Sequence, residues 1–309
     1  MTHLSSLKYL LLAALIQLVW GFTPSASRIV LDSLPVEIYS AFRYSVAGLI
    51  FLTYTLVRYK RLQLRLKDLP AVAVIGILAY ALDSLGTLYG LKLGGVLNFS
   101  LASSLNAVIT AVVAALVLKE RFSRAVWLAA ALSIGGGVLL AAGKYDLSNI
   151  QVAGGSLCLI WGAYVLEALG FVFSKRFKAR MPLTEYLAVA QLSAAAFMWA
   201  LSAAAGKSPR AIADMPPAGL WSLAFVCLVS CCLCYFLLYW LLNFVEGHKL
   251  AFFDFFHTLS AAAFGAMLFD EVVNAEMLLG GALLAGAVVL ISWRHVRHGS
   301  DDKTGLLAS

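Results

Sequence analysis

The sequence predicts an all-α membrane protein of ten transmembrane helices, in two inverted five-helix repeats with both termini cytoplasmic. Three observations support this fold class. Of the 309 residues, 62% are hydrophobic and only 13% are charged, whereas a soluble domain carries about 25% charged residues. The apolar residues gather in long segments separated by short polar connections, and short motifs of the first half recur in the second.

Each segment is long enough to cross a bilayer, since a spanning helix needs roughly 20 mostly apolar residues. The alternating pattern of a membrane β-barrel is missing from the sequence. We expect the first segment to be retained as a helix, because it is too long for a cleavable signal. The expected spans lie at about residues 8–29, 37–57, 69–91, 96–118, 125–142, 153–174, 183–204, 219–243, 250–269 and 277–293.

The basic residues set the expected orientation. If the N-terminus is cytoplasmic, the cytoplasmic connections hold most of the Lys and Arg, notably residues 58–67 and 175–180. Cytoplasmic loops of membrane proteins are enriched in these residues. The net charge of +7 is therefore distributed as topological anchors. It does not form the single basic patch that nucleic-acid binding needs.

A long-range repeat indicates the architecture. Trp20-Gly21 in the first segment recurs as Trp161-Gly162, and Glu120 after the fourth span recurs as Glu271 after the ninth. Five spans per half is an odd number, so the second half enters the membrane from the opposite side. Inverted halves that enclose a site near the midplane are a common plan for secondary transporters. We expect repeats at residues 8–142 and 153–294, and a disordered cytoplasmic tail at 295–309.

Ionisable residues inside spans are the first functional candidates, because a charge at the bilayer centre costs about 3 kcal/mol or more and usually faces a cavity or partner. Tyr80 and Asp83 share one face of the third span. Arg43 enters from outside on the second span at about the depth of Asp83. We therefore expect an Arg43–Asp83 ion pair in the outer half, acting as a structural lock, a gate or both.

Three further candidates lie in the expected cytoplasmic half: Glu167, Asp254 and His257. Buried carboxylates and histidines can exchange protons under physiological conditions, which suits proton coupling or cation binding. Two alternatives stay open at this point. Asp254 could be hydrated at the end of its span, and His257 could be a packing residue.

Aromatic and polar residues complete the candidate substrate cavity. Gln17, Trp20, Gly21 and Pro24 share one face of the first span, where Gly21 would permit close helix approach and Pro24 would loosen the backbone ladder. An aromatic wall would suit a cationic group, although Trp20 and Trp161 could instead anchor the protein at the membrane interface. The full candidate cavity contains Gln17, Trp20, Tyr80, Asp83, Asn106, Trp161, Tyr164, Glu167 and His257.

Sequence patterns typical of enzymes and metal sites are missing. The chain has no Walker loop, HExxH motif or GxSxG motif. Its five cysteines lie inside apolar segments with spacing unlike that of a zinc site, so we interpret them as packing residues. We therefore expect no catalysis, no cofactor and no bound metal, and gradients rather than ATP as the source of energy.

Several motifs, in order, resemble a known family. They are Trp20-Gly21-Phe22-Thr23-Pro24-Ser25, Leu118-Lys119-Glu120-Arg121 and Gly135-Gly136-Gly137-Val138, then Trp161-Gly162, Leu268-Phe269-Asp270-Glu271, Gly280-Gly281 and Gly286. The chain resembles the drug/metabolite transporter superfamily, specifically chains with two EamA-type domains, over about residues 8–294. Where that family often has a proline, this chain has Asn106 and His257, which removes the basis for expecting a kinked substrate helix.

The resemblance implies a secondary transporter of small organic metabolites, often an exporter of amino acids or related amphiphiles working by alternating access. We expect a monomer or homodimer in a bacterial cytoplasmic (inner) membrane. The first alternative is an importer or exchanger of a cationic or cofactor-like metabolite. A non-transporting membrane receptor or scaffold is the second, and a channel is disfavoured because the polar groups are isolated rather than arranged in rings.

Overall fold

A computed structural model describes residues 3–103, 105–117, 150–178, 180–241 and 254–269, with short pieces between 128 and 286. All regular elements in these ranges are helical. They are α1 (His3–Trp20), α2 (Thr23–Leu31), α3 (Val36–Tyr59), η1 (Leu66–Asp68), α4 (Leu69–Gly76), η2 (Ile77–Leu82), α5 (Asp83–Ser103), α6 (Asn106–Val117), α8 (Ile150–Lys178), α9 (Leu183–Ala204), η4 (Pro209–Ile212), α10 (Pro217–Ala224), η5 (Phe225–Cys234), α11 (Tyr235–Leu241) and α13 (Asp254–Phe269).

Five helical segments of the described residues are long and apolar enough to cross a membrane. Two shorter apolar helices, Gly154–Gly170 and Phe256–Phe269, match the sixth and ninth expected spans. More than half of the fifth and of the tenth expected span falls outside the described residues, so ten spans stay a prediction. The five long segments are Leu11–Leu31, Val36–Tyr59, Leu66–Val96, Leu183–Ala204 and Pro217–Leu237.

The first span is broken in the middle rather than continuous. Helix α1 ends at Trp20 and α2 begins at Thr23, with Pro24 in its first turn. Proline lacks a backbone N–H and is tolerated there, because that donor has no partner within the helix. The predicted effect of Pro24 on the backbone ladder therefore takes the form of a break at Gly21-Phe22.

The expected third and fourth spans meet at a single glycine. Gly95 has a φ of 78° and changes the direction of the chain within α5, a backbone conformation that favours glycine. The fourth span is then broken again, because α5 ends at Ser103 and α6 begins at Asn106. Without the proline of related chains, the sequence offers no basis for expecting a kink at Asn106, yet the helical run is interrupted just before this residue.

The two halves repeat the same irregular element. The π-helical segments η2 and η5 begin at Ile77 and Phe225, 148 residues apart, and each follows an eight-residue α-helix. π-Helical turns are rare and occur mostly at functional sites. Their recurrence in the third and eighth expected spans is independent support for the internal repeat.

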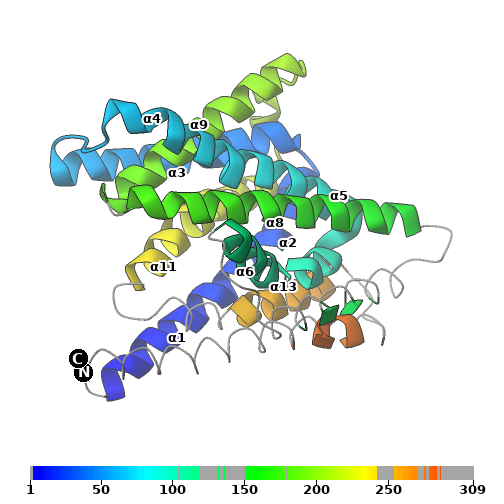
Figure 1. The fold of residues 1–309 in the computed structure, drawn as a ribbon. Coiled ribbons are helices and arrows are strands. Elements are labelled where there is room, and N and C mark those ends of the chain that lie inside the picture. Colours follow the sequence, from blue (N-terminus) through cyan, green and yellow to red (C-terminus); the bar gives the residue numbers. More distant parts are fainter. Residues whose placement is uncertain are drawn as a thin grey trace, which may run out of the picture.

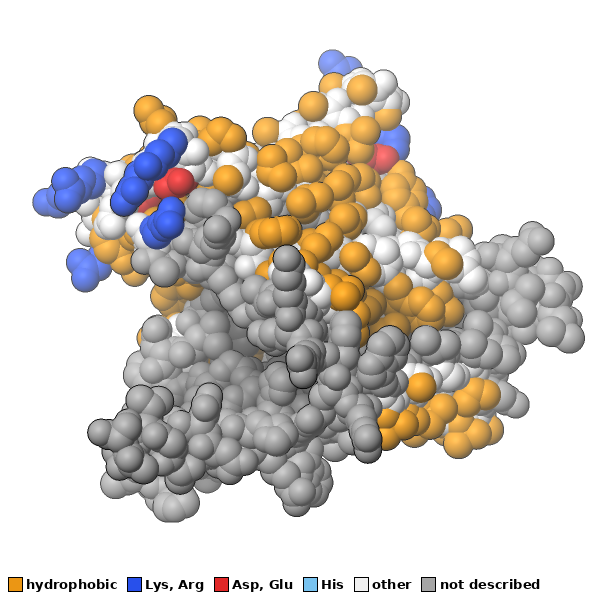
Figure 2. Space-filling model, viewed as in Figure 1, with side chains coloured by type: hydrophobic (Ala, Val, Ile, Leu, Met, Phe, Trp, Pro, Cys, Tyr) orange, Lys and Arg blue, Asp and Glu red, His pale blue; other side chains and the backbone are white. Residues whose placement is uncertain are grey.

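Packing is organised around two helix pairs, α3 with α9 and α5 with α8. In Figure 1, α8 crosses the middle of the molecule, with α3, α4 and α9 on one side and α1, α6 and α13 on the other. The largest fully buried side chains include Tyr39 of α3 and Tyr186 of α9. In Figure 2, hydrophobic side chains cover the middle of the described surface and Lys and Arg gather toward its ends, as expected for a bilayer environment.

Candidate functional site

Two of the predicted cavity residues are in direct contact. Asn106, the first residue of α6, donates from Nδ2 to Glu167 Oε2 of α8 at 2.9 Å. Thr110 Oγ1 lies one helical turn further along α6, 3.4 Å from Asn106 Oδ1. The break between α5 and α6 thus brings a polar helix start to the carboxylate of Glu167. A side-chain amide that donates to a carboxylate stabilises its ionised form.

Asp83 is the second carboxyl group of this region. It follows the π-helical segment η2 as the first residue of α5. Its Oδ1 atom is buried and has no hydrogen-bond partner among the described residues. Asp83 is within electrostatic range of both Glu167 and Arg43. A buried carboxyl oxygen without a donor carries a desolvation cost, so this atom is a candidate to bind a proton or a cationic ligand.

The predicted Arg43–Asp83 ion pair is not formed. Arg43 donates from Nη2 to Ser84 Oγ at 2.7 Å and to Tyr44 OH at 2.7 Å. No carboxylate oxygen of the described residues lies within 4.0 Å of the guanidinium, which instead sits over the rings of Tyr39 and Tyr44. Ser84 follows Asp83 immediately and also contacts Ser40 Oγ at 2.6 Å. Hydroxyl groups and aromatic faces thus replace the expected carboxylate.

A chain of aromatic rings crosses from the first span to the second. Trp20 packs edge-on against Tyr235, with centroids 4.8 Å apart. Tyr235 lies 6.2 Å from Tyr80, which lies 5.6 Å from Tyr44 beside Arg43. Trp20 is therefore engaged with other helices of the protein. This arrangement favours the interior interpretation of Trp20 over interfacial anchoring.

The second predicted tryptophan also packs inside the protein. Trp161 lies against the cluster that contains Ile160 and Tyr164 of α8 and Ala102 of α5. Its Nε1 atom is buried and has no hydrogen-bond partner among the described residues. Tyr164 is 5% exposed. Trp161 is thus partly buried against this cluster, which favours the interior interpretation of its side chain.

The remaining predicted residues lie on the first and ninth expected spans. Gln17 is buried, and its backbone carbonyl accepts a hydrogen bond from Gly21 N at 2.9 Å. His257 lies on α13, and its carbonyl oxygen faces Gly21. Gly21 thus permits the close helix approach that its position predicted. Asp254 begins α13, but its side chain lies outside the described residues.

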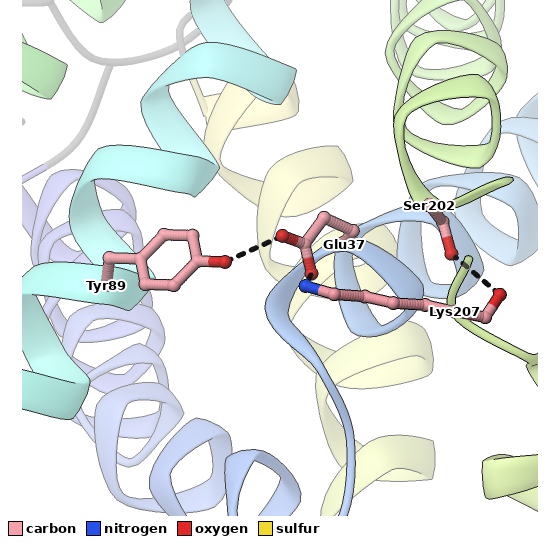
Figure 3. A network of polar contacts seen from close by, with 4 residues as sticks. All are labelled: Glu37, Tyr89, Ser202 and Lys207. Carbon is pink, nitrogen blue, oxygen red and sulfur yellow. Dashed lines mark hydrogen bonds and ion pairs between the residues drawn. The ribbon is translucent and has the colours of Figure 1, made fainter. Parts of the chain in front are cut away.

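Two functional candidates were missed from the sequence, Glu37 and Glu185. Glu37 lies at the start of α3, accepts a 2.6 Å hydrogen bond from Tyr89 OH and pairs with Lys207 (Figure 3). Glu185 lies at the start of α9 and accepts hydrogen bonds from Gln63 N and Leu64 N at 2.7–2.9 Å. Glu37 thus joins the start of α3 to the chain that follows α9. Glu185 joins the start of α9 to the chain that follows α3.

A sequence signal for this pair did exist. Glu37 and Glu185 are 148 residues apart, the same spacing as the two π-helical segments, and each closely follows a proline that precedes its helix.

Burial disfavours the charged form of Lys207, but the hydrogen bond and charge attraction from Glu37 outweigh this effect and raise the pKa of Lys207.

The cysteines show no arrangement of a metal centre in the described part of the chain. Cys227, Cys231 and Cys234 are buried in η5 with free thiols. No group of three or more metal-ligating side chains occurs among the described residues. Packing within the helix bundle is the role that their positions support.

Apolar helices, a repeated π-helical element and buried ionisable groups between helices define this protein as a polytopic membrane protein with an internal polar cluster. The sequence matches the model of the EamA-like transporter family twice, at residues 7–142 and 155–293. The chain therefore belongs to the EamA-like transporter family. Membership assigns it to the drug/metabolite transporters, integral membrane proteins that carry small molecules.

One solved structure adds support for the fold. It is described only as the crystal structure of a protein, and it covers 92% of this chain and 97% of its own length with a TM-score of 0.64. The two sequences are 19% identical, so the similarity concerns the fold alone. No curated protein matches this sequence.

Proposed function

We propose that this chain is a gradient-driven secondary transporter that exports amino acids or related amphiphiles by alternating access. The observation that carries the proposal is the group formed by Glu167, Asn106 and Asp83, contributed by both halves of the chain. Carboxyl groups within membrane spans are costly and usually mark a substrate or ion pathway. An inverted-repeat transporter binds its substrate where the two halves meet.

The chemistry of this group suits an amino group. Asp83 and Glu167 supply two carboxyl groups, and the rings of Tyr80, Trp20 and Trp161 supply aromatic surface that attracts cations. Arg43 is positively charged and lies within electrostatic range of Asp83. A ligand with an ammonium group and a carboxylate would complement both charges.

Coupling to a proton gradient is the second part of the proposal. Asp83 and Glu167 are neighbouring carboxyl groups that can share one proton. We take Glu167 as the leading candidate for proton coupling, with Asn106 holding its side chain in place. Asp254 and His257 of the ninth expected span are further candidates for proton or cation coupling. We place the protein in a bacterial cytoplasmic membrane with both termini inside, as a monomer or homodimer.

Flux from proteoliposomes tests the proposal. Vesicles containing the purified protein are loaded with single radiolabelled amino acids, and a pH gradient is imposed. The intact protein should release at least one of them, and Glu167→Gln should abolish the release or uncouple it from the gradient. The matched control is Asp32→Asn, since the Asp32 side chain is 65% exposed and distant from Glu167 in sequence.

Two results would count against the proposal. Unaltered flux and pH dependence in Glu167→Gln would remove Glu167 from the mechanism. Folded protein that releases no amino acid under any gradient would reject amino-acid export. The second candidate function is an exchanger of cationic metabolites, and choline-like cations in the same panel test it. The site favours this candidate in one respect, because it holds two carboxyl groups and only one arginine.

A further inference from the structure

Two pairs of helices are locked internally by close glycine contacts. On α5, Gly86, Gly90 and Gly94 recur every fourth residue and face α8, where an added Cβ would come within 2.6 Å of Leu159 O, 2.4 Å of Ile160 Cγ1 and 2.3 Å of Ser156 Oγ, respectively. This small-xxx-small pattern lets helix backbones approach closely in membranes. Ser156 Oγ also donates to Gly90 O at 2.8 Å. We treat α5 and α8 as one packed unit.

The second unit consists of α3 and α9. Gly48 of α3 faces Leu192 of α9, where an added Cβ would lie 2.7 Å from its side chain. Thr55 donates to Thr184 at 2.8 Å, and Trp199 donates to Ser45 at 3.0 Å. Close packing and buried hydrogen bonds thus hold this pair along its length.

The third expected span belongs to both units. Its first part, α4, packs on α9, since an added Cβ at Gly76 would lie 2.3 Å from Ala190 O. Its last part, α5, packs on α8. Between them lies the π-helical segment η2 (Ile77–Leu82), in contact with both units. Sharp bends in helices occur at such interruptions, so η2 is the position where this span can flex.

Few polar contacts of the described residues join the first part of α5 to α3. At the start of α5, Ser84 contacts Ser40 and Arg43 of α3. Near the start of α3, Tyr89 donates to Glu37. Tyr89 is 36% exposed, while Glu37 is 6% exposed. Figure 3 shows Tyr89 of α5 pointing to Glu37 from one side, while Lys207 approaches Glu37 from the chain after α9.

The repeat is asymmetric at this point. Glu185 is the counterpart of Glu37 in the second half, and it accepts hydrogen bonds from the connection after α3. Shifting Tyr89 by 148 residues gives Leu237, which has no hydroxyl group to donate. The tie to a neighbouring span therefore exists at the Glu37 end of the α3–α9 pair, whereas at the other end no hydroxyl group of the described residues donates to Glu185.

We propose that α5 and α8 move as one body against α3 and α9, with η2 as the hinge and the Tyr89–Glu37 hydrogen bond as a latch that keeps the Glu37 end closed. The Glu185 contact stays intact throughout. By the basic-residue topology, the latched end is external. The role of this motion in transport rests on the proposed function, whereas the latch itself does not.

Hydrogen–deuterium exchange of the protein in lipid nanodiscs tests the latch. The variant Tyr89→Phe removes only the hydroxyl group, and Tyr59→Phe is the matched control, because Tyr59 is an exposed tyrosine of α3. A hydrogen bond to a charged group corresponds to at least about tenfold in an opening equilibrium. Backbone amides of α5 around Tyr89 should therefore exchange at least about tenfold faster in Tyr89→Phe.

A second variant distinguishes a latch from a general anchor. Glu185→Gln should speed exchange in residues 60–66 and leave α5 unchanged. Unchanged exchange of α5 in Tyr89→Phe would overturn the latch, and so would faster exchange spread over α3 and α9. Exchange needs no substrate, so these results separate the latch from transport: failed flux with a positive exchange result rejects the proposed function alone.

Discussion

Replacing Gly21 with alanine should destabilise the protein, whereas the same change at Gly162, its counterpart in the second half, should not. An added Cβ at Gly21 would lie 1.7 Å from Ser260 Oγ, 2.7 Å from His257 O and 3.0 Å from Ala261 N. The serine hydroxyl can rotate away. The two backbone atoms can move only if α13 moves, so the overlap forces the helices apart.

The magnitude follows from these contacts. Overpacking by one methyl group in a well-packed interior costs about 1–3 kcal/mol, and the backbone overlap places Gly21→Ala at the upper end. At Gly162, no described atom lies within 4 Å of the added Cβ. Alanine is favoured over glycine in a helix by about 1 kcal/mol. The two variants should therefore differ by about 3–4 kcal/mol in free energy of unfolding.

Thermal unfolding of detergent-purified protein, followed by tryptophan fluorescence, measures the difference. Gly21→Ala should lower the Tm by several degrees, and Gly162→Ala should leave it unchanged or raise it slightly. Adding Ser260→Ala to Gly21→Ala should recover only part of the loss, because His257 O stays in place. Equal Tm values for the two glycine variants, or complete recovery by Ser260→Ala, would refute the close backbone approach of α1 and α13.

Three other predictions concern charged side chains. Arg43→Ala and Ser84→Ala should each destabilise the protein, the latter by about 1–2 kcal/mol, and a double-mutant cycle should show less than additive loss because they share one hydrogen bond; additive losses would contradict the contact. Glu185→Gln should weaken its bonds to the connection after α3 and speed trypsin cleavage within residues 58–67, and an unchanged cleavage rate would count against its bracing role. Lys207→Met should lower the Tm by a constant amount from about pH 6 to about pH 9, because a raised folded-state pKa gives stabilisation that is complete below lysine's ordinary pKa and is lost only as pH rises through the folded value; a difference that fades within that range would be inconsistent with this sign.

The sequence allowed the class of fold to be predicted, because length and hydropathy of a span are set by the bilayer itself. Interruptions within spans were harder to predict. The break before Asn106 needs no proline, and nothing in the local sequence marks η2 or η5 as π-helical. Both depend on which side chains pack against the helix, which a single sequence does not reveal. Only a comparison of the two halves of the sequence, aligned at a spacing of 148 residues, could have pointed to these interruptions.

For the candidate site, the sequence singled out residues but not the contacts between them. Depth along two helices placed Arg43 near Asp83, but depth does not separate adjacent residues, and the guanidinium contacts Ser84 instead. Asn106 and Glu167 were each singled out, yet their contact depends on how α6 packs on α8. Glu37 and Glu185 were missed because they lie at helix starts, where carboxylates are ordinary and give no signal of their own.

Ligand-induced thermal stabilisation, measured with a metabolite panel at two pH values, tests the central claim most directly. A ligand that binds the folded state raises the apparent Tm. We predict that an amino acid or an amine-bearing amphiphile stabilises the intact protein with a pH-dependent shift, and that Glu167→Gln loses this shift while it stays folded. A flat panel with folded protein, or an equal shift in Glu167→Gln, would contradict a small-molecule site built on Glu167.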